Sequence, residues 1–164
     1  MSQTPLHTYL NDHLAGSVMA LELLEHLADV APTPDARQFF SNLRGEITAD
    51  QEDLQQLLRG LGGTESVVRQ AGAWVAEKFA RVKLRVDDVA QGRLRLLEGL
   101  ETLALGIQGR LALWTALETV SDRIAELRKL DFPRLQQRAR DQHAEVEARR
   151  LAAARESLSQ SSAA

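Results

Sequence analysis

The chain has 164 residues, 44% of them hydrophobic and 26% charged, which is the composition of one globular domain and excludes a disordered or fibrous protein. It contains no cysteine, so disulfide bonds, thiolate metal sites and cysteine nucleophiles are excluded. A net charge of −3 with both signs intermixed argues against a nucleic-acid partner, and no apolar run approaches the roughly 18 residues that a membrane span requires.

Helices are the only elements that the sequence predicts, because Leu, Ala, Arg and Glu dominate and apolar residues recur with the 3.6-residue period. Thr4 followed by Pro5 predicts an N-cap with proline at the first helical position, and Thr33 with Pro34 repeats this pattern. The predicted helices cover 5–30 and 34–60. Because the connection between them is short, they are expected to lie antiparallel as neighbours.

The second half of the chain predicts a shorter helix, a long one and a last one, at 66–84, 93–127 and 133–156, with a tail at 157–164. The segment VDDVAQG at 86–92 is expected to break the helical pattern, and Asp131 is expected to cap the last helix. The whole chain, 1–164, is therefore predicted to be a single all-α domain. Its architecture would be a ferritin-like antiparallel four-helix bundle with a shorter bridging helix, five helices in all.

The apolar faces of these helices differ in width. The helix over 93–127 is apolar nearly all round, which predicts the most covered position in the bundle. The helix over 133–156 carries the narrowest apolar stripe and is expected to be the least firmly docked element. That stripe consists of Leu135, Ala139, Val146 and Ala153.

The predicted order of elements is two long helices, a short bridging helix and two more helices. Ferritin-like bundles have the same order. With segments such as YLNDHLAGSVMALELL, AGAWVAEKFARVKL and LGIQGRLALW, the chain resembles a group of uncharacterised bacterial all-helical proteins. The resemblance covers Tyr9 to about Glu147 and implies a fold but no activity.

A ferritin-like fold raises the question of a di-metal carboxylate centre. Such centres take a Glu from each of two helices and a Glu-x-x-His from each of the other two. The sequence departs from this pattern, because Ala49 stands three residues after Glu46 and Arg140 stands three before His143. Within ELLEH at 22–26, the periodicity aims Glu22, Glu25 and His26 at solvent. The candidates for a divalent metal (Fe, Mn or Zn) are His13, Glu46, Asp50 and Glu101.

A second constellation involves His13 and Asp50, which both fall within apolar stripes. His13 lies 19 residues before Pro32 and Asp50 lies 18 after it, so the two are expected to face each other at one height of the hairpin. A carboxylate beside the imidazole would favour its charged form. Either a polar contact that fixes helix register or a metal or proton-transfer role is compatible with this placement.

Lys78 lies at the edge of an apolar face beside Trp74 and Phe79. Its ammonium group is expected either to reach water or to be desolvated enough to act as a base or nucleophile. No glycine-rich phosphate loop and no Ser-His-Asp arrangement is present.

The interpretation that follows is a non-enzymatic structural or interaction protein without a cofactor. We expect it to form homo-oligomers and to offer the helix over 133–156, in which arginines alternate with acids, to a protein partner. The alternative is a metal-binding or oxidative ferritin-like protein. The start MSQTPLHTYL lacks the features of a signal peptide, so a cytoplasmic location without membrane contact is expected.

Overall fold

The computed structural model describes residues 4–63 and 89–159, and every regular element in that part of the chain is helical. The elements are α1 (Pro5–Asp29), α2 (Pro34–Gly60), α4 (Val89–Glu118), the short 3₁₀ helix η1 (Leu127–Lys129) and α5 (Phe132–Leu158). The all-helical prediction is confirmed. The predicted helix over 66–84, including Lys78, lies outside the described residues.

The predicted caps account for where three of the helices begin. The side chain of Thr4 accepts a hydrogen bond from the backbone of His7, at 3.3 Å, and starts α1. Thr33 does the same for α2, and Asp131 for α5, each at 3.1 Å. Each side-chain oxygen satisfies a backbone N–H that has no acceptor within its own helix.

The end of α2 is closed by glycine. Gly62 adopts a φ of +81°, and its N–H bonds to the carbonyl of Arg59, while the N–H of Gly63 bonds to that of Leu58. This pair of bonds satisfies two terminal carbonyls, and the left-handed backbone it requires is strained for a residue with a side chain.

The predicted bounds of the long helix over 93–127 are wrong at both ends. The helix α4 begins at Val89, inside the predicted break, and ends at Glu118. Beyond it, Val120 N bonds to the carbonyl of Leu117, so the chain tightens into three-residue turns. The hydroxyl of Ser121 also bonds to the carbonyl of Glu118, at 2.8 Å, which offers the backbone an alternative to a further helical turn.

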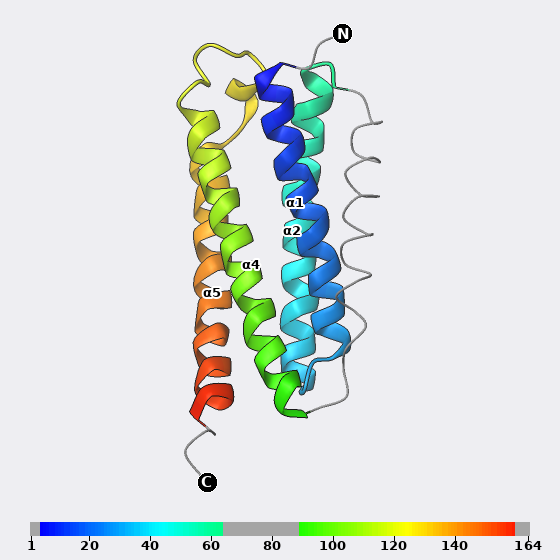
Figure 1. The fold of residues 1–164 in the computed structure, drawn as a ribbon. Helices are drawn as coiled ribbons and strands as arrows, with labels where there is room; N and C mark the ends of the chain where they lie inside the picture. The colour runs from blue at the N-terminus through cyan, green and yellow to red at the C-terminus, as the bar shows by residue number, and fades with distance from the viewer. Residues whose placement is uncertain (1–3, 64–88, 160–164) are drawn as a thin grey trace.

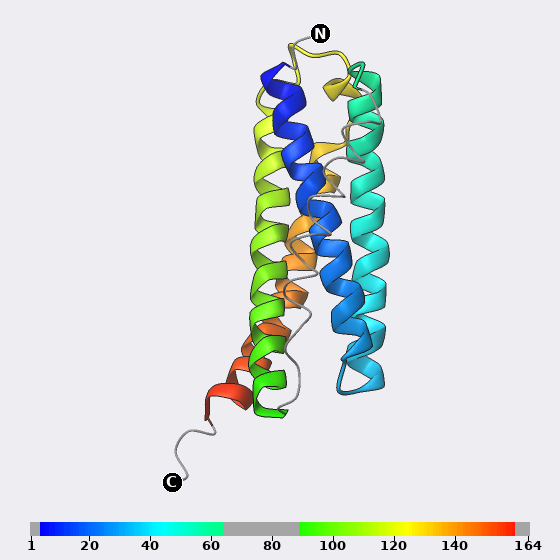
Figure 2. The same cartoon turned by 45° about the vertical axis from the view of Figure 1, so that its right-hand side comes forward.

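The four long helices form two hairpins that lie side by side (Figures 1 and 2). One hairpin is α1 with α2 and the other is α4 with α5; the closest packing is within each hairpin, and α1 also packs along α4. The helix α2 ends at the end of the molecule opposite to that at which α4 begins, so these two helices run in the same direction (Figure 1). None of the described helices combines the length and apolar character needed to cross a membrane.

The expectation that the last helix is the least firmly docked is not supported, because α5 and α4 share the most extensive helix–helix contact in the described structure. The reason is that polar residues extend its narrow apolar stripe. Gln136 and Gln142 are 9% and 3% exposed; the side chain of Gln136 donates to Glu118 of α4, and that of Gln142 donates to Glu46 and Asp50 of α2. A buried amide with partners packs at low cost, so hydropathy alone underestimated the buried face of α5.

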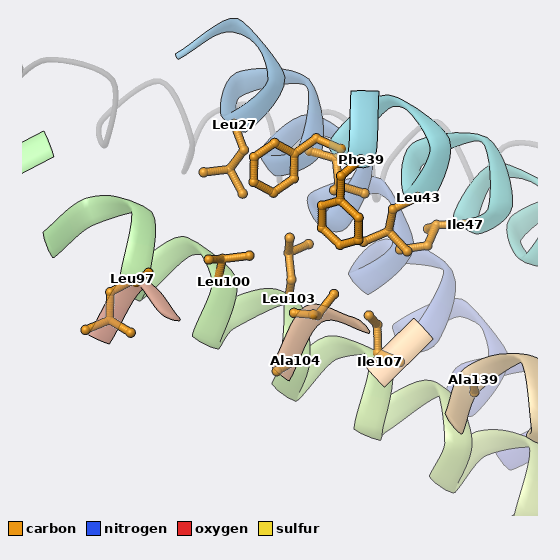
Figure 3. Close-up of a cluster of buried hydrophobic side chains, with 14 residues drawn as sticks. Leu27, Phe39, Leu43, Ile47, Leu97, Leu100, Leu103, Ala104, Ile107 and Ala139 are labelled. Atoms are coloured by element: carbon orange, nitrogen blue, oxygen red, sulfur yellow. The ribbon is translucent and has the colours of Figure 1, made fainter. Parts of the chain in front are cut away.

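The apolar interior consists of two separate clusters. The first, the Phe40 cluster, gathers side chains from all four long helices; Figure 3 shows Leu27 of α1 and Phe39 of α2 directed towards Leu100 and Leu103 of α4. The second, the Trp114 cluster, lies towards the end of the molecule that holds η1. Its buried members are Leu10, Leu14, Leu54, Leu57, Leu58, Leu113, Trp114, Leu117, Leu127, Phe132 and Leu135.

Candidate functional site: a polar layer in the bundle

Between the two apolar clusters lies a layer of buried or half-buried polar side chains, here called the polar layer: Asp50, Arg110, Arg138 and Gln142. On α2, Asp50 stands between Ile47 of the Phe40 cluster and Leu54 of the Trp114 cluster. Each member of the layer is three or four residues from an apolar neighbour on its helix, so the helical period directs it inwards.

Asp50 is the centre of the layer and is only 2% exposed. Its Oδ1 forms an ion pair with Nη2 of Arg138, and its Oδ2 accepts a hydrogen bond from Nε2 of Gln142 at 3.3 Å. Both partners come from α5. The carboxylate therefore links α2 to a helix of the other hairpin.

The same two side chains of α5 reach further carboxylates of α2. Nη2 of Arg138 also donates to Oδ2 of Asp53, at 3.0 Å, and Nε2 of Gln142 donates to Oε2 of Glu46, at 3.2 Å. A single guanidinium nitrogen, Nη2 of Arg138, is thus shared by two carboxylates.

Burial and neighbouring charges act against each other on Asp50. Removal from water raises the pKa of its carboxyl, while the charges of Arg110 and Arg138 and the hydrogen bond from Gln142 lower it; burial prevails. The net shift of the pKa is upward, because the ionised carboxylate loses more favourable hydration than its ion-pair and hydrogen-bond partners replace.

Arg110 is 8% exposed and forms no ion pair with any described residue. Burial lowers the pKa of its guanidinium. The charge of Asp50 acts in the opposite direction, and the charge of Arg138 lowers the pKa further. Arginine nevertheless remains charged in proteins. The layer therefore contains a buried cation whose counter-charges lie beyond direct contact.

The expected hydrogen bond between His13 and Asp50 is absent from the described structure. His13 is half-buried and packs edge-to-face on Tyr9, with 4.7 Å between ring centroids. Its pKa is lowered, first by burial and then by the charge of Arg110, with only Asp12 acting in the opposite direction. The expected shift towards the charged form is wrong, because burial disfavours the charged imidazole and the charge of Arg110 acts in the same direction.

The four metal candidates do not come together. Glu101 is exposed, with its Oε2 3.8 Å from Nη1 of Arg150, and Glu46 is exposed at the edge of the layer. Asp50 is occupied by Arg138, and His13 lies next to Arg110. In residues 4–63 and 89–159, no three acidic or histidine side chains are grouped so that they could hold a metal ion.

Sequence reasoning placed Asp50 correctly in the interior but missed the roles of Arg138 and Gln142. Both belong to an arginine-rich segment that was interpreted as a surface. A signal was present, because Gln142 lies three residues after Ala139 and four before Val146, inside the apolar stripe of α5.

A second link between α2 and α5 lies nearer the α1–α2 turn. Nη1 of Arg149 is 3.3 Å from Oδ2 of Asp35, and the guanidinium carbon lies 3.9 Å from the ring centroid of Phe39. Acidic residues of α2 thus face basic residues of α5 at two heights of the bundle. These links are made by long side chains rather than by close approach of the two backbones.

Comparison of the chain with protein-family models, with curated proteins and with solved structures finds no match in any of the three.

Proposed function

We propose that this protein is a non-enzymatic, ferritin-like helical bundle with a structural or interaction role, in which arginine side chains hold the carboxylates that a metal would otherwise require. The observation that carries the proposal is the position of Arg138 across Asp50 and Asp53. Ferritin-like metal proteins gather carboxylates in the middle of the bundle around cations. Here the cation at that height is a guanidinium.

The order and direction of the helices support the ferritin-like part of the proposal. In single-crossover bundles of this kind, two antiparallel hairpins are joined so that the second and the following long helix run in the same direction. The helices α2 and α4 have this relation (Figure 1).

A role in interaction, with self-association as its simplest form, is supported by leucines on the outside of α4 and α5. Leu105 is 68% exposed and Leu158 is 61% exposed, with Leu94 and Leu151 at 42% and 45%. Exposed leucines on a helix surface are a usual component of contacts between helical bundles.

Metal analysis tests the first part of the proposal. Protein prepared with excess Fe, Mn and Zn is expected to retain no stoichiometric metal, and its melting temperature is expected to be the same with and without a chelator. Stoichiometric metal together with a lower melting temperature in chelator would contradict the proposal and favour the metal-binding alternative.

Sedimentation analysis tests the second part. We expect a dimer or larger assembly that dissociates when Leu105 or Leu151 is replaced by Glu. The matched control is Val30→Glu, since Val30 is 53% exposed but lies at the end of α1. A wild-type protein that remains monomeric at all concentrations would refute self-association.

A further inference from the structure

Two buried hydrogen-bond donors on α4 have no acceptor among residues 4–63 and 89–159. Nη1 of Arg110 and Nε1 of Trp114 are both inaccessible to solvent and unpartnered, and the two residues are 8% and 0% exposed. They are four residues apart, so they lie on one face of the helix about one turn from each other.

An unpartnered donor at this depth requires an explanation, because leaving a buried polar group without a hydrogen bond is costly. The cost is higher for a guanidinium, which carries a full charge. The nearest carboxylates do not relieve it: Asp50 and Asp53 are engaged by Arg138, and neither forms an ion pair with Arg110.

On the α1 side of Arg110, His13 is a group on which the charge of Arg110 acts, and Asp12 is the opposing charge. Trp114 adds the positive end of an indole N–H on the same face of α4. A negatively charged group beside Nη1 and Nε1 would meet both donors of α4, while Asp50 and Asp53, whose charges also act on Arg110, are engaged by Arg138.

A single water molecule would satisfy the two donors incompletely. Water accepts hydrogen bonds but must also donate its own two, and buried waters usually make about three bonds in all. An oxyanion accepts from every donor and also places a negative charge in direct contact with the guanidinium, which Asp50 and Asp53 do not do.

We propose that the bundle binds a small oxyanion, a carboxylate or an inorganic phosphate, between α1 and α4, held by Nη1 of Arg110 and Nε1 of Trp114. On α1, His13 responds to the charge of Arg110 and forms a T-shaped pair with Tyr9, which is 36% exposed.

The indole N–H of Trp114 provides a direct test. The chain has two tryptophans, so an NMR spectrum of ¹⁵N-labelled protein should show two indole signals, and Trp114→Phe identifies one of them by its loss. Acetate, formate and phosphate are titrated separately against sodium chloride of equal ionic strength. We expect a saturable shift of the Trp114 signal with at least one oxyanion, and which of them produces it distinguishes a carboxylate from a phosphate site.

Substitutions locate the anion. Arg110→Met should weaken binding about tenfold or more, because it removes the charge-assisted hydrogen bond. The matched control Arg134→Met removes an exposed arginine of α5 and should leave the affinity unchanged. If Arg110→Met does not fold, Trp114→Phe removes the N–H donor and keeps a smaller aromatic side chain at this position. In that variant, oxyanions should raise the melting temperature less than they do in the unsubstituted protein.

Three results would overturn the proposal. The first is a Trp114 signal that no oxyanion shifts saturably, for example because it contacts only a bound water. The second is a saturable shift of equal affinity in Arg110→Met. The third is an equal loss of affinity in Arg134→Met, which would indicate general charge rather than a site.

Discussion

Arg138 contacts two carboxylates of α2 with one nitrogen, and its side chain is 24% exposed while that of Asp50 is 3% exposed. Replacing it by Met leaves the buried carboxylate of Asp50 without its ion-pair partner. We expect Arg138→Met to lower the free energy of unfolding by about 2–3 kcal/mol, less than for a fully dry pair because water reaches this guanidinium. Urea denaturation measures the change.

The control for this substitution is Arg134→Met on the same helix. Nε of Arg134 is 3.9 Å from Oδ2 of Asp131, and both side chains are more than half exposed. Exposed pairs of this kind contribute little, so this variant should be nearly neutral. Equal effects of the two substitutions would show that the buried position of Asp50 is not what makes Arg138 important.

His13 should make the protein sensitive to mild acid. Its folded-state pKa lies below the ordinary 6.5, so the folded protein binds fewer protons than the unfolded chain in this range. Its contribution to stability is therefore complete above pH 6.5 and is lost as the pH falls through the folded pKa. In His13→Asn this loss should disappear from the pH dependence of urea denaturation.

A direct NMR titration of the His13 ring provides the independent check. A midpoint above 6.5 would mean that the imidazole has a carboxylate partner, as the sequence suggested, and that Arg110 does not control it. The sequence could place His13 and Asp50 at one height from their distances to the turn, but not their partners. Those partners come from α4 and α5, which are distant along the chain.

At the scale of the helices, α5 offers a test of how polar residues contribute to docking. Its buried positions continue from Phe132 through Val146, and the last of them is Ala153. We therefore expect slow amide exchange from 135 to 146, comparable with α4, and faster exchange after Ala153. Rapid amide exchange along the whole of α5 would contradict this expectation. It would instead support the prediction from the narrow apolar stripe that the last helix is the least firmly docked.

The helix bounds were predicted well where a local capping signal sets them, and poorly where only hydrophobic periodicity was available. The helices α1 and α2 begin at the predicted residues because a capping threonine and a following proline act locally. The end of α4 was missed because apolar residues continue past Glu118 while the backbone tightens into turns at Thr119 and Ser121. Hydrophobic periodicity records which residues are buried, not whether the backbone between them remains α-helical.

For the whole molecule, the polar layer aligns the two hairpins. Replacing Asp50, Arg110, Arg138 and Gln142 together by Leu or Met removes both buried charges of the described residues, Asp50 and Arg110, and leaves no orphaned partner within the layer. We expect a higher melting temperature, as in other proteins whose buried ion pairs were replaced by apolar residues. We also expect extra or broadened amide signals, because the links that set α2 against α5 are gone.

A single sharp set of signals at a higher melting temperature would contradict the second expectation. The layer would then be a cost to stability that gives no structural specificity in return. The matched control replaces only the exposed pair Asp35 and Arg149, which joins the same two helices outside the layer.

The division of the apolar interior has a consequence for how the molecule comes apart. The Phe40 and Trp114 clusters share helices but are separated by charged and amide groups, so each half of the bundle has its own hydrophobic driving force. Cavities made at Leu24 and at Leu113 should therefore have additive effects. We therefore expect the half near the α1–α2 turn to open while the half that holds Trp114 stays closed, so that calorimetry should show heat unfolding broader than a single all-or-none transition.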